Sequence, residues 1–270
     1  MFSPNKGKNY SDQEITEDLE NEKFLNHYFL RVTAKGKTFR SVDFRYTIFD
    51  HCYFRNSNFD SCDFTGCKFI NTNLYGAKFE GCNFSYTDFN NTIVDEDIID
   101  TSCPPYENLK LKFARTLRTN FAQLGNYDGV NKAILVELEA TEVHLKKAWH
   151  SKESYYRKKY KSRSTRFIMF LKWLWFKSLD IVWGNGESAY KLMRTIAFIL
   201  IFIGLVTVLN NYDPMHLSSY MKAMIVSPQI FLGVDVDLGI PNSFLAFITF
   251  LRLLMMGFFI SILIKRLSRR

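Results

Sequence analysis

A large apolar residue recurs at every fifth position in the N-terminal part of the chain. The series keeps one phase over eleven units: Phe39, Phe44, Phe49, Phe54, Phe59, Phe64, Phe69, Leu74, Phe79, Phe84 and Phe89. Two positions before each stands a mostly small residue, such as Thr47, Cys52 or Ser57. Neither the strand period of two nor the helix period of 3.6 produces this pattern. It predicts a four-sided coil in which residues twenty apart stack at strand spacing, roughly 4.8 Å.

This pattern resembles the pentapeptide-repeat family, in which a small residue is followed by Asp or Asn and then by Leu or Phe. Residues 37–93 match it, with Asp or Asn in the middle position at Asp43, Asn58, Asp63, Asn73, Asn83 and Asp88. The resemblance implies a right-handed quadrilateral β-helix, which we place at residues 36–102 with about three coils. Ser11 and Glu14 have the spacing of a capping box. They predict a helix near residues 12–22, within an N-terminal cap formed by residues 1–35.

Four cysteines occupy the small inward position of the repeat: Cys52, Cys62, Cys67 and Cys82. Their spacing lacks the C-x-x-C pair of many zinc sites, so we interpret them as core residues and expect no metal or cofactor. Some family members are acidic rods that mimic duplex DNA. Acidic and basic residues balance over residues 36–93, so we expect a binding or assembly module instead.

Residues 103–166 are predicted to form a helical pair and a basic juxtamembrane stretch. The helices lie at about 106–124 and 128–149, separated by Gly125 and Asn126, and are expected to cap the β-helix. The basic stretch carries these candidate ligand contacts: Lys152, Tyr156, Arg157, Lys158, Lys159, Tyr160, Lys161, Arg163 and Arg166. Cations on phosphates and tyrosines on bases would suit single-stranded nucleic acid. Charge facing anionic lipid is the favoured alternative, because apolar segments follow. The formal net charge of +8 also indicates an anionic partner.

The C-terminal third has the composition of a membrane domain. Residues 167–189 mix Phe and Trp with charges, which is typical of an interfacial helix. Residues 190–211 and 243–270 contain two predicted transmembrane helices, the latter with a basic tail. Lys and Arg gather outside the two spans, which predicts that both termini lie in the cytosol. The family resemblance implies that the membrane is the bacterial inner membrane. The intervening loop, 212–242, is interpreted as extracytoplasmic or re-entrant.

The order of span, short apolar segment and span resembles the two-helix ion-channel domain that is fused to pentapeptide repeats in some bacterial proteins. Gly257 fits that resemblance, but residues 231–237 lack the row of carbonyls of a potassium filter. Asp235 and Asp237 are interpreted either as an acidic ring that favours cations or as solvated loop carboxylates. Arg252 lies near the middle of the second span, where a charge costs at least about 2.5 kcal/mol. It is predicted to face a pore or gate, the alternative being a carbonyl partner and a packing role.

No motif with catalytic geometry is present, so we do not expect an enzyme. The sequence predicts an oligomeric membrane effector or ion-channel-like pore, with a tetramer favoured, gated by its cytosolic repeat region. The architecture resembles anti-phage membrane effectors of the Hailong type, which implies a nucleotide or single-stranded DNA oligomer as ligand. The alternative is a non-conducting, membrane-anchored scaffold that binds a partner protein through the β-helix.

Overall fold

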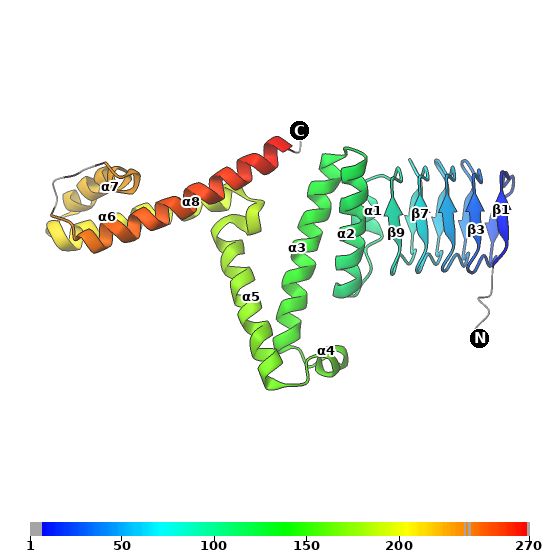
Figure 1. The fold of residues 1–270 in the computed structure, drawn as a ribbon, viewed down its shortest axis with the longest axis horizontal. Coiled ribbons are helices and arrows are strands. Elements are labelled where there is room, and N and C mark those ends of the chain that lie inside the picture. Colours follow the sequence, from blue (N-terminus) through cyan, green and yellow to red (C-terminus); the bar gives the residue numbers. More distant parts are fainter. Residues whose placement is uncertain (1–6, 235, 237–238, 269–270) are drawn as a thin grey trace. The chain divides into compact units, whose positions relative to one another are not determined.

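The computed structural model describes residues 7–234, 236 and 239–268. The chain forms two compact units, Met1–Phe170 and Leu171–Arg270, which we call the solenoid unit and the helical unit. Each has a hydrophobic core of its own. The solenoid unit contains a β-solenoid followed by helices, and the described residues of the helical unit form α-helices, loops and one 3-10 turn (Figure 1).

Nine short strands form the solenoid (Figure 1): β1 (Asn9–Ser11), β2 (Leu19–Glu20), β3 (Tyr28–Leu30), β4 (Thr38–Arg40), β5 (Ile48–Asp50), β6 (Asn58–Asp60), β7 (Lys68–Ile70), β8 (Lys78–Glu80) and β9 (Asp88–Asn90). They make two parallel sheets, ordered β1-β3-β5-β7-β9 and β2-β4-β6-β8. Isolated parallel bridges, such as Thr33 with Tyr53 and Asp43 with Asp63, connect successive turns on the other two sides. The predicted four-sided coil is therefore present.

Phenylalanine rings fill the solenoid and stack from one turn to the next. Phe39 lies over Phe59 with ring centroids 4.8 Å apart, and Phe59 lies over Phe79 at 5.2 Å. The Phe49 and Phe69 rings also stack, at 4.8 Å. These spacings equal the distance between paired strands, so backbone pairing and ring stacking support each other. The stacking predicted from the twenty-residue spacing is confirmed.

The small inward side chains also make hydrogen bonds that link neighbouring turns. Ser57 donates its hydroxyl to the carbonyl of Ala34 at 2.6 Å, and Thr72 donates to the carbonyl of Phe49 at 3.1 Å. Cys67 makes the equivalent contact with Phe44 at 2.8 Å. In each pair the acceptor lies 23 residues earlier. A short side chain with a donor fits this position because it fills little space and leaves no buried polar atom unpaired. The cysteines thus act as weak donors within the core.

Each corner of the coil is a residue with positive φ, and these residues recur at every fifth position from Asn21 to Asn91. Most are Asn or Gly, which tolerate the left-handed conformation better than other residues. The corner residues are Asn21, Asn26, Arg31, Gly36, Ser41, Tyr46, His51, Asn56, Ser61, Gly66, Asn71, Gly76, Gly81, Tyr86 and Asn91. The period of five therefore fixes the bends as well as the core.

The predicted N-terminal helix near residues 12–22 is wrong, because the solenoid already begins at β1. Residues 9–35 belong to the solenoid, which makes about four turns instead of three. Tyr10 pairs with Phe29, nineteen positions later, whereas Leu19 pairs with Phe39, twenty positions later. The one-residue difference moves Tyr10 out of phase with the later repeat. Ser11 consequently lies in a strand, and the Ser11–Glu14 spacing has no capping role.

Three helices follow the last strand: α1 (Ile98–Thr101), α2 (Glu107–Gln123) and α3 (Tyr127–His150) (Figure 1). The last two are the predicted helical pair, and α2 packs against β9. Asn120 accepts a hydrogen bond from the Thr92 amide and donates one to the Thr92 carbonyl, both at 2.7 Å. Thr116 and Gln123, on the same face of α2, accept from the amides of Phe89 and Asn91 at 2.9 Å. Side chains of α2 thus replace the backbone of the turn that would come next.

We expect Asn120→Leu to lower the free energy of unfolding by about 2–4 kcal/mol, because it leaves the buried amide and carbonyl of Thr92 unpaired. Thr119→Ala on the exposed face of the same helix is the control and should change stability little. Thermal unfolding of the full chain in detergent measures both. Equal stability of the two variants would show that α2 does not terminate the solenoid in this way.

The remaining helices are α4 (Ser154–Lys159), α5 (Arg163–Trp183), α6 (Ala189–Asn211), α7 (Leu217–Leu232) and α8 (Asn242–Ser268), with a 3-10 turn at Gly184–Gly186 before α6. Helices α6 and α8 are long and apolar enough to cross a membrane. Only 28% and 17% of their apolar windows are buried, which disfavours the alternative of core helices in a soluble protein. Lys265 near the end of α8 pairs with Glu187 before α6 at 3.0 Å, so the two helices are antiparallel.

Helix α7 packs closely along α6 through small side chains. Ser219, Ala223 and Ser227 are buried at intervals of four residues on α7. Opposite them on α6, a Cβ at Gly204 would lie 3.5 Å from the Sδ of Met224 and 3.9 Å from the carbonyl of Ala223. Small residues that let two backbones approach are typical of helix pairs inside membranes.

Gly204 on α6 and Gly257 on α8 provide a matched pair of substitutions. Gly204→Leu should weaken the packing of α6 on α7 by about 1–3 kcal/mol, because the contact has no room for the added carbons. Gly257→Leu on α8 should have a much smaller effect, since nothing lies within 4 Å of a Cβ there. Unfolding of the detergent-solubilised protein compares them. A Gly257 variant as unstable as the Gly204 variant would contradict this packing.

Candidate functional site

Arg252 lies on α8 beside the end of α7. Gly233 caps α7 with a left-handed φ of 81°. A Cβ at Gly233 would lie only 1.9 Å from the Nη1 of Arg252, so the guanidinium occupies the space that a side chain would need. Within the described residues, Arg252 has neither a hydrogen bond nor an ion pair. A carbonyl partner for Arg252, one of the two sequence interpretations, is therefore not found among them.

A polar hollow of about 420 Å³ surrounds the Arg252 side chain. Asn242 and Thr249 supply polar side chains to its wall, and Gly233 and Gly239 leave backbone accessible. Such a hollow can hold water or an ion against the guanidinium, which lowers the cost of a charge in an apolar helix.

Of the other predicted pore residues, only Gly257 belongs to the described part of the chain. Asp235 and Asp237 lie outside the described residues, so their role as an acidic ring remains a prediction. Gly257 lies on α8 but does not line the hollow, and its Cα faces open space. Only Arg252 of the four is placed at a described cavity.

The basic stretch divides into exposed cations and side chains that are held in the fold. Arg166 donates from Nε and Nη2 to the carbonyl of Trp149, at 3.1 and 2.9 Å. Tyr156 is only 3% exposed, and two guanidinium nitrogens of Arg157 are buried. The exposed members are Lys152, Lys158, Lys159, Lys161 and Arg163. These cations remain candidates for an anionic ligand, whereas Tyr156 has no accessible face on which a base could stack.

His144 on α3 contacts two of the three tyrosines of this stretch, Tyr156 and Tyr160. Its Nδ1 lies 3.3 Å from the Tyr156 hydroxyl, and its Nε2 lies 3.2 Å from the Tyr160 hydroxyl. A neutral imidazole can accept at one nitrogen and donate at the other, so it can bond to both. Burial, with a smaller contribution from the nearby Lys159 ammonium, lowers the pKa of His144. These contacts depend on how α4 folds back towards α3, so no local sequence pattern indicates them.

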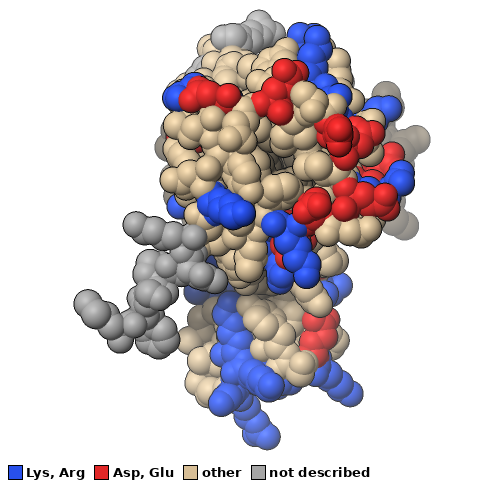
Figure 2. All heavy atoms as spheres, turned by 90° about the vertical axis from the view of Figure 1, so that its right-hand side faces the viewer, with Lys and Arg blue, Asp and Glu red and all other residues tan. Residues whose placement is uncertain are grey.

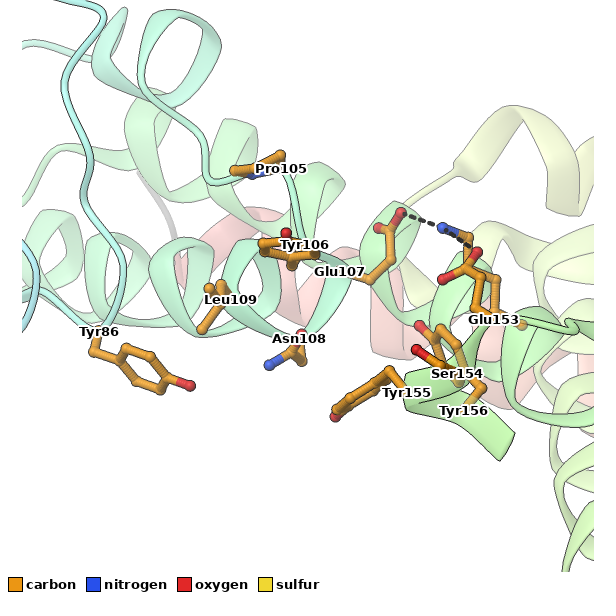
Figure 3. A pocket seen from close by; sticks show the side chains of 11 residues that line it. Tyr86, Pro105, Tyr106, Glu107, Asn108, Leu109, Glu153, Ser154, Tyr155 and Tyr156 are labelled. Atoms are coloured by element: carbon orange, nitrogen blue, oxygen red, sulfur yellow. Dashed lines mark ion pairs between the residues drawn. The ribbon is translucent and has the colours of Figure 1, made fainter. Parts of the chain in front are cut away.

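Figure 3 shows a second hollow of about 550 Å³, lined by residues from the last solenoid turn, α2, α3 and α4. Tyr86 and Tyr155 line it from different elements, with Asn108 between them. Lys147 pairs with Glu107 at 3.6 Å and with Glu153 at 3.3 Å. Ammonium groups of Lys112 and Lys159 lie over the Tyr86 and Tyr155 rings, 4.8 and 5.4 Å from their centroids. The exposed aromatic faces suit stacking, a feature that the repeat pattern did not predict for Tyr86.

Figure 2 shows both signs of charge on the solenoid and a concentration of Lys and Arg on the part of the solenoid unit that holds α4. Ion pairs on the solenoid surface include Arg45 with Asp43 at 2.7 Å and Arg40 with Asp60 at 3.3 Å. A uniformly acidic, DNA-like surface is therefore absent from the face shown. The architecture is that of a β-solenoid followed by helices, two of which are candidate membrane spans.

Comparison with known proteins identifies the repeat from which the solenoid is built. Residues 39–74 and 57–94 match the family described as pentapeptide repeats, in eight copies. Two trypsin-treated variants of QnrB1, a plasmid-mediated fluoroquinolone resistance protein, resemble the chain at 18% and 21% identity, with TM-scores of 0.19 and 0.18. These matches cover 33% and 31% of this chain, which spans 59% and 56% of the QnrB1 chains. No curated protein matches the chain. The solenoid is thus built from pentapeptide repeats.

The His144 contacts predict a pH-dependent stability. Because the folded-state pKa of His144 is lowered from 6.5, the unfolded chain binds more protons as the pH falls through that value. The stabilisation is therefore present above the ordinary pKa and is lost on acidification. Thermal unfolding from about pH 7.5 to about pH 5 should show a steeper decline for the wild type than for His144→Gln, which cannot titrate. Parallel declines would mean that His144 does not contribute.

Proposed function

We propose that this protein is an ion-channel-like membrane protein in which several copies of the helical unit surround a conducting path lined by Arg252. Helices α6 and α8 are the membrane spans, and α7 packs beside them as the short apolar segment of the loop. The pentapeptide-repeat solenoid with its helical cap serves as the assembly and sensing region. A tetramer is the arrangement favoured by the resemblance to two-helix channels.

The guanidinium of Arg252 carries the proposal. Within the described part of the chain it lacks a carboxylate or carbonyl partner, although it lies in the longest apolar helix. A charge in that setting is usually tolerated where it faces a bundle interior or a water-filled cavity. The polar hollow at Arg252 supplies such a cavity, and facing copies of α8 would enlarge it.

The ends of the spans support a hairpin with both outer ends on one side of the bilayer. Lys265 bonds to Glu187 and to the carbonyl of Gly186, and Trp183 stacks on Phe258 with centroids 4.3 Å apart. At the same end, Lys191 pairs with Asp180 at 2.6 Å, and Arg194 donates to the carbonyl of Ile181. Aromatic and charged side chains of this kind gather where a helix leaves the hydrocarbon region.

The sensing role is the less constrained part of the proposal. A nucleotide or DNA oligomer as ligand, and a setting in anti-phage defence, remain predictions from the sequence. The exposed cations of residues 152–163 and the tyrosine-lined hollow of Figure 3 are the places where such a ligand would bind.

Ion flux through reconstituted protein tests the proposal. Arg252→Gln should change the ratio of open to closed states by about 70-fold, because it removes a charge that costs about 2.5 kcal/mol in the middle of an apolar helix. Lys222→Gln removes one exposed charge from α7 and should leave the current unchanged.

The mass of the detergent-solubilised protein distinguishes a pore from a scaffold. A ring of subunits agrees with a channel, whereas a monomer that never conducts would overturn it and favour a membrane-anchored scaffold. An Arg252→Gln current identical to that of the wild type would remove Arg252 from the conducting path.

A further inference from the structure

A third hollow lies in the solenoid unit, between the end of α3 and the beginning of α5. It has a volume of about 410 Å³ and is lined by five side chains: Trp149, Arg163, Arg166, Phe167 and Phe170. Three of them are aromatic and two are cationic, and none is acidic. This groove is separate from Arg252 and from the tyrosine-lined hollow.

The aromatic rings form an apolar floor, and the guanidinium groups lie at its polar edge. Trp149 and Phe170 meet edge to face with centroids 5.1 Å apart, and Phe167 lies 6.3 Å from Phe170. The two bonds from Arg166 to the Trp149 carbonyl fix that guanidinium in place. Arg163 is exposed and free to move towards a ligand. The groove therefore offers two positive charges beside apolar surface, with no carboxylate among its lining residues to neutralise them.

The apolar floor continues as a stripe along α5, none of whose side chains is buried. The stripe consists of the following exposed residues: Phe167, Ile168, Leu171, Leu174, Trp175 and Ile181. Phe167, Leu171, Leu174 and Ile181 follow one another at four, three and seven positions, and Ile168 and Trp175 lie beside them. The six thus share one face, about 21 Å long at 1.5 Å per residue. Trp175 is 69% exposed, which is unusual for so large an apolar side chain. Only a short turn separates α5 from the candidate span α6.

We infer that this groove binds the headgroup phosphate of an anionic phospholipid. Arg163 and Arg166 hold the phosphate oxygens, the aromatic floor takes the glycerol and first acyl carbons, and the stripe of α5 lies among the acyl chains. A guanidinium matches phosphate in both charge and geometry. A soluble phosphate ester would account for the arginines but would leave the floor and the stripe unoccupied. The inference rests on the membrane location in the proposed function, but it requires neither a pore nor an oligomer.

Lipid binding to the purified, delipidated full chain tests the inference. Native mass spectrometry in a neutral detergent measures the affinity for phosphatidylglycerol and for phosphatidylcholine. Each arginine near the surface should contribute about fivefold, so Arg163→Gln should weaken phosphatidylglycerol binding about fivefold and the double variant with Arg166→Gln about 25-fold. Lys68→Gln/Lys78→Gln removes two exposed cations of the solenoid strands, outside the groove, and should leave the affinity within about twofold.

Arg163→Gln decides the matter if the double variant fails to fold, because the exposed Arg163 makes none of the bonds that fix Arg166. Equal affinity for the two lipids, or an affinity unaffected by Arg163→Gln, would overturn the inference. Competition by glycerol 3-phosphate at the same concentration as phosphatidylglycerol would also overturn it, in favour of a soluble phosphate ester. A monomeric, non-conducting protein that keeps this lipid selectivity would refute the pore and leave the lipid site standing.

Discussion

Stacking of side chains twenty residues apart is the constraint on which the solenoid depends. Each turn presents its Phe rings to the rings of the next turn at strand spacing, and no turn can bury its core alone. The same repetition places Ser, Thr or Cys donors against the carbonyls of the preceding turn. At the end of a repetitive core, the last turn has no following turn to pair with its backbone groups. Helix α2 supplies the missing partners, because the side chains of Thr116, Asn120 and Gln123 accept hydrogen bonds from backbone amides of the last turn.

The helical unit is stabilised differently from the solenoid, because its helices expose most of their apolar surface. Close approach of α7 to α6 depends on small residues, and the position of Arg252 depends on the missing side chain of Gly233. A guanidinium in an apolar helix is costly in lipid, and Arg252 makes no hydrogen bond or ion pair with residues 7–234, 236 and 239–268. The pore hypothesis gives the charge a setting in which water and other subunits surround it.

The basic stretch illustrates how one sequence feature can divide into several physical roles. Arg166 ties the start of α5 to the end of α3, and Tyr156 and Tyr160 enclose His144. The lysines of this stretch remain exposed. Arg163 and Arg166 additionally border an aromatic groove that continues along α5. We place the proposed lipid contact, favoured on sequence grounds, at this groove, whereas the burial of Tyr156 disfavours stacking of a base on it.

The sequence by itself determined the solenoid, its inward residues and the antiparallel helical pair. Each follows from a local repeat of apolar residues, which predicts the same structure whatever the neighbouring segments are. It also determined the two apolar helices, since length and composition suffice for them. The first turn was missed because a single-residue change of register moves Tyr10 and Ile15 out of phase with the five-residue repeat. Leu19, Phe24 and Phe29 are still in phase with it. Only the tertiary structure decided how Arg252 meets Gly233, how His144 meets two tyrosines and how Trp149 reaches Arg166. Those contacts join residues from separate elements, and their geometry depends on how the helices pack and the loops turn, which no local pattern encodes.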